Sequence, residues 1–373
     1  MFFGEKLIYN NFMYRINIYN YNFSIKLTSI FLGSDIYSLS YVNELNKTGS
    51  ARFTIPVLNT KATTTNIKLY NKIKIYKNDT VKFVGYIENI QAGVNELEIG
   101  CLGILGIFKK RIITNVYYAT TVQATFEDIL DTINAVNDTG ITFGVTTIAQ
   151  VLNRIELNRV TVASVWNKLS NLADQAEYII NGDLTLDFKS SIGTDKSSSI
   201  ILQYLVTQIN TANVEDFEIE ISGKDMVNKV SAVGKAIYST KSDATSILNY
   251  GILEETLNEV QTYNQTDLDT EAQNYIDAHK QEFYIPTIVP NISKINIELF
   301  KLGDIIKLIL SNGYIIVNQN EKIIKIAVDV SNNNIEKLSL SLVPITTNLL
   351  PSSFIEEDIS SLNKRVSLLE GAL

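Results

Sequence analysis

The sequence is poor in the residues on which most catalytic and metal sites depend. Among its 373 residues it has one cysteine, Cys101, and one histidine, His279. A single cysteine excludes an intrachain disulfide, and a single histidine excludes a multi-histidine metal site within one chain. Only five prolines interrupt the chain, so long strands are free to form. These absences argue against an enzyme, and we predict no catalytic residues, no cofactor and no metal.

The chain also lacks an excess of positive charge and a long apolar run. Its formal net charge is −8, whereas proteins that grip nucleic acid cluster lysine and arginine to release counterions from the phosphates. Specific DNA binding is therefore disfavoured, although an acidic wall suits a channel through which DNA slides. No apolar segment approaches the roughly 18 residues that span a bilayer, so we expect no membrane span and no signal peptide.

The residues that are plentiful favour a folded β-protein. Hydrophobic residues make up 45% of the chain and charged residues 19%, which is a globular composition. The 19 tyrosines and 15 phenylalanines raise the expected strand content. The length leaves room for two or three domains.

One β-meander is written twice, in residues 72–101 and 304–342. Each copy reads as strand, turn, long strand, turn, strand. Turn residues lie at 77–79 and 93–95 in the first copy, and at 311–313 and 331–334 in the second. The separation is too large for a solenoid repeat. We therefore predict that the two segments superpose as equivalent modules.

Changes in hydrophobic period predict the rest of the fold, which is mainly β with an α+β middle. Helical spacing begins near Thr125 and again near Ser164, and the Asn181–Gly182 pair between alternating flanks is a strong hairpin signal. A further helix is expected over 266–281, with Thr266 as its cap. The expected parts are a first small, tube-like β-barrel over 1–111, an inserted α+β domain over 112–212 with 241–289 packing on it, a similar second β-barrel over 213–345 (213–240 plus 290–345), and a linker with a short C-terminal coiled-coil helix over 346–373.

The C-terminal segment has a heptad pattern. Ser353 and Glu356 form a capping box after Pro351. Apolar residues then follow at alternating spacings of four and three, which predicts an oligomerisation seam. The members of this seam are Ile355, Ile359, Leu362, Val366, Leu369 and Leu373. Such a short helix is unstable alone, so it requires a body that already holds copies together. The alternative is a terminal helix packed on its own subunit.

Several polar or glycine-rich groups suggest chemistry but have simpler explanations. Asp267, Asp269 and Glu271 lack the loop and glycine of a calcium site and suit the first turns of a helix. Asp183 and Asp187 are four apart on a strand, which separates them by roughly 13 Å. The spacing of Gly100, Gly103 and Gly106 is not that of a dinucleotide loop. We expect His279 to be partly exposed near the end of a helix.

Three stretches resemble baseplate hub or tail hub proteins of tailed phages and related contractile injection systems. The first stretch includes Ala51 to Pro56, Lys74 to Asn78, Phe83 to Ile87 and Leu97 to Cys101. The second stretch includes Val165-Trp166, Glu177-Tyr178 and Gly182 to Phe188. The third stretch includes Val230 to Lys235, Tyr250-Gly251 and Gly303-Asp304. Together they cover most of residues 50–345 in the order found in that family. Their order, more than any one motif, carries the resemblance.

The resemblance implies a homotrimeric ring whose two similar barrels adapt a sixfold tail tube to a threefold tip. The implied partners are further copies of the chain, a tail tube or distal tail protein, and a tip, spike or receptor-binding subunit, with genome DNA passing through the lumen without specific binding. The implied location is the baseplate or tip of a virion tail, assembled in the host bacterial cytoplasm. Many relatives carry a lytic or receptor-binding extension, whereas this chain stops at Leu373. We therefore expect those roles to belong to another subunit.

Two other functions are compatible with the sequence. The first is a tail-tip adhesin that binds cell-surface glycans through exposed tyrosines. The second is a peptidoglycan-cleaving tail protein. A ligand-dependent rise in melting temperature would distinguish the adhesin, and zymography on cell walls would distinguish the enzyme.

Overall fold

The computed structural model describes residues 13–345 except 147, 208–210, 259–261 and 332–334. As expected, the fold is mainly β. Thirteen of its strands form one sheet, whose main path is β14-β18-β21-β20-β3-β4-β7-β6-β5-β1-β2, with β19 beside β20 and β13 beside β19. The strands of this sheet are β1 (Tyr14–Tyr19), β2 (Lys26–Phe31), β3 (Ser38–Glu44), β4 (Ser50–Pro56), β5 (Lys72–Lys77), β6 (Thr80–Ala92), β7 (Glu96–Gly103), β13 (Ile201–Leu205), β14 (Val214–Ser222), β18 (Phe283–Pro290), β19 (Ile305–Ser311), β20 (Ile316–Val330) and β21 (Glu336–Pro344).

The two predicted meanders have the same strand order, and their registers match around a bulge in each long strand. In the first module the long strand β6 pairs antiparallel with β5 and β7, and in the second β20 pairs antiparallel with β19 and β21. Each long strand carries a β-bulge against its third strand, at Glu88 in β6 and at Ile324 in β20. Counted from the bulges, Ile87 is equivalent to Ile323 and Cys101 to Leu342, and all four are buried. The duplication predicted from turn spacing is thus present in the described strands.

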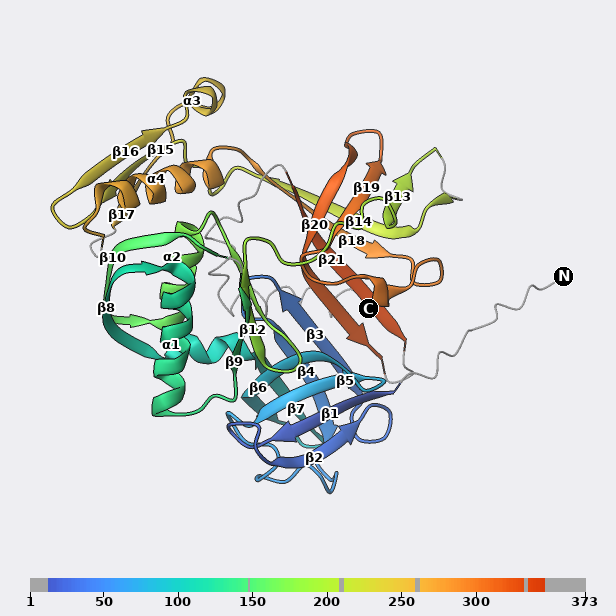
Figure 1. Ribbon diagram of the computed structural model, residues 1–373. Coiled ribbons are helices and arrows are strands. Elements are labelled where there is room, and N and C mark those ends of the chain that lie inside the picture. Colours follow the sequence, from blue (N-terminus) through green and yellow to red (C-terminus); the bar gives the residue numbers. More distant parts are fainter. Residues whose placement is uncertain (1–12, 147, 208–210, 259–261, 332–334, 346–373) are drawn as a thin grey trace.

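The outer strands continue this equivalence. In the first module β7 pairs with β4 and β4 with β3, while in the second β21 pairs with β18 and β18 with β14. From the shared registers, β4 is equivalent to β18 and β3 to β14. The sequence predicted two separate barrels, but no closed barrel is found among the described strands. Instead β3 pairs with β20, so the two modules share one continuous sheet and one hydrophobic core. Figure 1 shows the first module in blue below the orange and red strands of the second.

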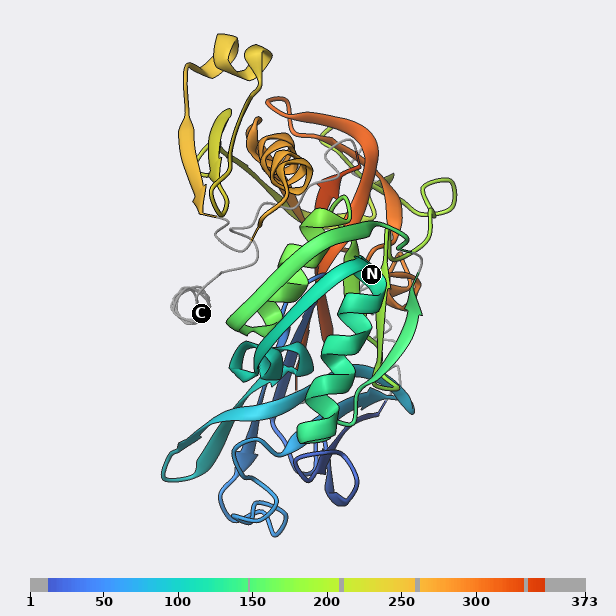
Figure 2. The same cartoon turned by 60° about the vertical axis from the view of Figure 1, so that its left-hand side comes forward.

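The α+β part contains a small repeat of its own, which Figure 2 shows from the side. A strand leads into a helix twice, as β8 (Ile112–Thr121) into α1 (Val122–Val136) and β10 (Val151–Thr161) into α2 (Val162–Leu172). The threonine that ends each strand caps the helix that follows it, and β8 and β10 pair antiparallel. Both helices therefore begin slightly before the positions predicted from periodicity, because the caps are Thr121 and Thr161.

Aromatic residues form the centre of this part. Phe126 of α1 stacks on Trp166 of α2 and on Phe188, with ring centroids 4.6 and 4.2 Å apart. Phe188 lies in β12 (Thr185–Lys189), which pairs with β11 (Glu177–Ile180) in the hairpin predicted from Asn181–Gly182. β12 also pairs with β9 (Thr142–Thr146). The 3-10 helix η1 (Ile104–Lys110) adds Phe108, whose ring centroid lies 4.4 Å from that of Trp166 and which links this core to the first module.

A third unit has its own small core. The strands β15 (Lys229–Val233), β16 (Tyr238–Ser242) and β17 (Glu254–Asn258) form a separate sheet, against which α4 (Gln265–His279) packs. The short helix α3 (Ala244–Tyr250) joins two of these strands. This unit lies away from the large sheet at the upper left of Figure 1. The sequence predicted that 213–240 belongs to the second barrel, whereas only β14 of that stretch joins the large sheet.

Candidate functional site: the junction between the two modules

The junction is built on the pairing of β3 with the second half of β20. Their register runs from Lys325 opposite Glu44 to Val330 opposite Leu39. Val330, Leu39 and Tyr41 are all buried where the strands meet. β19 occupies the same edge of β20 only as far as Lys322. The bulge at Ile324 therefore marks the point at which β20 changes partner, from its own module to the other one.

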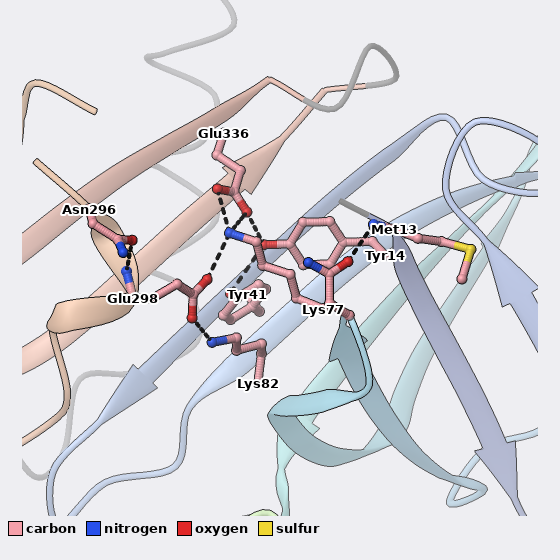
Figure 3. Close-up of polar contacts among 9 residues, drawn as sticks. Met13, Tyr14, Tyr41, Lys77, Lys82, Asn296, Glu298 and Glu336 are labelled. Carbon is pink, nitrogen blue, oxygen red and sulfur yellow. Dashed lines mark hydrogen bonds and ion pairs between the residues drawn. The ribbon is translucent and has the colours of Figure 1, made fainter. Parts of the chain in front are cut away.

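A buried polar cluster lies beside this pairing (Figure 3). Glu336 opens β21, Lys77 closes β5 and Tyr14 opens β1, so the cluster joins three strands of two modules. The Tyr14 hydroxyl donates to the Glu336 carboxylate, and Lys77 Nζ donates to it at 2.8 Å. Glu336 and Lys77 are almost completely buried. A buried carboxylate is tolerated in the native state when it is paired in this way.

Glu298 extends the cluster toward the surface. It belongs to the 3-10 helix η3 (Ile297–Leu299), whose cap, Asn296, accepts a 3.0 Å hydrogen bond from the Glu298 backbone. Its carboxylate lies 2.8 Å from Lys77 Nζ and also binds Lys82. Partial burial would raise the pKa of Glu298, but the hydrogen bonds from Lys77 and Lys82 outweigh it and lower that pKa. Glu298 thus remains charged and completes a chain of alternating charges.

The two tyrosines of the cluster act as neutral donors and spacers. Burial raises the pKa of Tyr14, and the nearby Tyr41 and Glu336 raise it further. Burial also raises the pKa of Tyr41, whose hydroxyl oxygen lies 3.5 Å from that of Tyr14. Both phenols therefore stay protonated across the physiological range. The cluster therefore joins the modules through hydrogen bonds and ion pairs between groups of opposite charge.

Sequence reasoning missed this cluster, although a signal was present. Lys77 is in phase with the buried Ile73 and Ile75, and Glu336 is in phase with the buried Leu338 and Leu340. A charged residue at a core-facing strand position requires a partner of opposite charge. Lys77 ends the first strand of one module and Glu336 begins the last strand of the other, and their charges are opposite. What the sequence does not show is that these two strand ends meet.

The structure separates the other residues considered for chemistry. Cys101 is buried, and burial raises the pKa of its thiol. The expectation that His279 is partly exposed is wrong, because the residue is buried. Its ring stacks on that of Tyr275 with 4.0 Å between centroids, and its Nδ1 lies 2.8 Å from the Tyr275 carbonyl oxygen. Burial lowers the pKa of His279. Neither residue lies at the junction.

The acidic residues of α4 bind different partners and do not form one site. Asn264, not Thr266, caps this helix. Glu271 forms a 3.2 Å ion pair with Lys168 of α2, whereas Asp269 accepts a hydrogen bond from Ser239 of β16. Among the described residues, no group of three or more His, Cys, Asp or Glu side chains is placed to hold a metal ion.

The remaining candidate residues have local roles. Asp183 accepts hydrogen bonds from the Thr185 backbone and hydroxyl in the hairpin turn, and Asp187 accepts from the Val145 backbone at 2.9 Å. Gly103 packs against Gly49: its backbone N–H donates to the Gly49 carbonyl at 2.6 Å, and a Cβ on Gly103 would lie only 2.9 Å from the Gly49 nitrogen. No helix in the described ranges is long and apolar enough to cross a membrane. The predicted seam from Ile355 to Leu373 lies outside the described residues.

Comparisons with known proteins extend these observations. No model of a known protein family matches the chain, and no curated protein matches its sequence. Solved structures do match over most of its length. A tail protein from Neisseria meningitidis superposes with a TM-score of 0.66 at 13% identity, over 89% of this chain and 96% of that one. The 43 kDa tail protein of prophage MuSo2 from Shewanella oneidensis gives a TM-score of 0.64 at 11% identity, over 90% of this chain and 99% of that one.

A secretion component shares the same architecture. An E. coli component of the type VI secretion system, described as similar to the T4 bacteriophage tail proteins gp27 and gp5, matches with a TM-score of 0.53 at 10% identity, over 84% of this chain and 75% of that one. At such low identities these matches establish the fold. The resemblance identified from the sequence is therefore confirmed at this level: the chain has the fold of phage tail proteins and of this related secretion component.

Proposed function

We propose that the protein is a structural hub of a phage or phage-like tail tip or baseplate. In this proposal it forms a trimeric ring that adapts a sixfold tail tube to a threefold tip. The observation that carries the proposal is the pair of equivalent modules, which have matching bulges and are joined head to tail by β3 and β20. Three chains that repeat this head-to-tail arrangement would present six similar modules around one axis.

The polar cluster supports the same role. A ring that transmits force between tube and tip requires its modules to keep a fixed relation to each other. The buried contacts of Lys77 and Tyr14 with Glu336 restrain that relation, because a shift of one module against the other would leave a buried charge without its partner.

We further propose the partners and the division of the chain that this role requires. One face of the ring would bind a tail tube or distal tail protein, and the other a tip, spike or receptor-binding subunit, within the tail of a virion assembled in the host cytoplasm. Residues 14–103 would supply one tube-like module, β14 together with residues 283–344 would supply the other, and 346–373 would project as a coiled-coil helix. Because the chain has a net charge of −8, the lumen of the ring would let genome DNA pass without specific binding.

Imaging and mass measurement test the ring. Negative-stain electron microscopy of the purified protein should show a threefold ring with a central hole, and light scattering should give three times the 41.8 kDa chain mass. If the protein is a monomer or a dimer both alone and in the assembled particle, the hub proposal is wrong.

A further inference from the structure

Two edges of the large sheet are open in the described part of the chain. Beyond the bulge at Glu88, the last four residues of β6, Asn89–Ala92, pair with β7 on one side, whereas the pairing of β6 with β5 ends at Tyr86. At the far end of the sheet, β14 pairs with β18 alone. Open strand edges are templates for pairing with another chain.

The equivalence of the modules shows what each open edge corresponds to. The open part of β6 is equivalent to the part of β20 that pairs with β3, because both follow the bulge. β14 is equivalent to β3, because both occupy the position outside the fourth strand of their module. β20 and β3 pair with each other inside the chain. Their equivalents, the end of β6 and the outer edge of β14, have no strand partner among the described residues.

Apolar side chains are buried at the paired edges of β20 and β3 and more exposed at the equivalent positions of β6 and β14, as expected if each of these edges lacks a partner strand. Val328 of β20 is 4% exposed at the junction, whereas its equivalent at the end of β6, Ala92, is exposed. Leu39 and Tyr41 of β3 are buried, whereas their equivalents on β14, Phe217 and Ile219, are only partly buried. Apolar side chains in register with a buried junction are thus left open at both free edges.

We propose that β14 of one subunit pairs antiparallel with β6 of the next, in the register that joins β3 to β20 within the chain. This proposal rests on the proposed ring and specifies its interface. Transfer of the internal register gives four pairs and brings Val94 near Phe217. The four pairs are Asn89 with Ser222, Ile90 with Ile221, Gln91 with Glu220, and Ala92 with Ile219.

The chemistry of these pairs fits a second copy of this chain in this orientation. Ile221 is 55% exposed in the isolated chain and would meet the apolar Ile90. Glu220 would meet the amide of Gln91, so no like charges face each other. Asp216, Glu218 and Glu220 line one exposed face of β14, and these acids would repel each other if two β14 strands paired. The acidic face thus disfavours the symmetric contact and leaves the head-to-tail one.

The proposed register is tested by a disulfide between subunits. Antiparallel neighbours lie about 4.5 to 5.5 Å apart at Cα, which a disulfide can span. A chain carrying Ile90→Cys and Ile221→Cys should, on mild oxidation, give a covalent trimer and no larger ladder on denaturing gels. A chain carrying Ile90→Cys and Ile219→Cys, displaced by two residues, should cross-link much more slowly. Cys101 is buried and should add little background.

The outcomes separate the register from the ring. If light scattering gives a trimer but the in-register pair does not cross-link, or cross-links no faster than the displaced pair, the proposed interface is wrong and the hub proposal stands. If no trimer forms, both are wrong. As a second test, Ile221→Asp should lower the trimer fraction at least tenfold, whereas Val136→Asp, at a residue 81% exposed at the end of α1, should leave it unchanged. Equal effects of these two changes would also overturn the interface.

Discussion

Lys77 and Glu336 stand 259 residues apart in the sequence, yet their side chains are joined by a 2.8 Å hydrogen bond between opposite charges. Lys77 lies at the end of β5 in one module and Glu336 at the start of β21 in the other, and neither is exposed. The contact therefore joins the two duplicated modules into a single folded unit. Its value to the fold should be visible when either charge is removed.

Glu336→Gln should destabilise the protein by about 2 to 4 kcal/mol, because it leaves the buried Lys77 with the partly exposed Glu298 as its carboxylate partner. Glu298→Gln is the matched control, and it should cost about 1 kcal/mol or less, since solvent screens this carboxylate. Urea denaturation at pH 7 measures both free energies of unfolding. A loss at Glu336 no larger than that at Glu298 would show that the buried pair does not hold the modules together.

Gly303→Ala should destabilise the protein more than Gly313→Ala. Both glycines have positive φ, +81° and +91°, so both changes introduce backbone strain. A Cβ on Gly303 would also lie 2.3 Å from the carbonyl oxygen of Ile192, whereas nothing lies within 4 Å of one on Gly313. The difference between their thermal unfolding midpoints measures this close approach. We expect Gly303→Ala to cost at least about 1 kcal/mol more, and equal midpoints would contradict the packing of the 192–194 loop on β19.

Glu321→Gln should stabilise the protein at pH 8 and have little effect at pH 4. Glu321 is fully buried in β20; Gln319 donates to one carboxylate oxygen, and no described residue binds the other. Burial raises its pKa from 4.5 to about 7. The folded state therefore holds this proton more tightly than the unfolded state, and the parent loses stability as the pH rises from about 4.5 to 7.

A glutamine mimics the protonated acid, so the variant should escape this loss, with a gain on the order of 1 to 3 kcal/mol at pH 8. Chemical denaturation at the two pH values measures the gain. Asp131→Asn, at an exposed residue of α1, serves as the control for general charge effects. A gain of equal size at pH 4 and pH 8 would show that titration of Glu321 is not the cause.

Local patterns in the sequence predicted the strands and turns of the modules, because alternation and turn residues act over a few positions. They also predicted both helices of the α+β part to within a turn. The pairing of β3 with β20 could not be predicted in the same way, since no local signal specifies which distant edge a strand will meet. For the same reason the expected separate barrels were replaced by one shared sheet. Lys77 and Glu336 could have been flagged as buried charges, but not as partners.

The last prediction concerns the C-terminal seam, which lies outside the described residues and remains a proposal. If the ring holds three C-termini close together, their high effective concentration stabilises a bundle that is too short to form alone. Leu362→Asp with Leu369→Asp should then disrupt the bundle and leave the ring, whose larger interface lies in the modules. Ser360→Asp with Ser367→Asp, off the seam, is the matched control. Light scattering should give a trimer for both double variants, while protease digestion should remove the terminal segment much faster only from the leucine variant. If both variants lose the segment at the same rate, the apolar spacing does not form a seam between subunits.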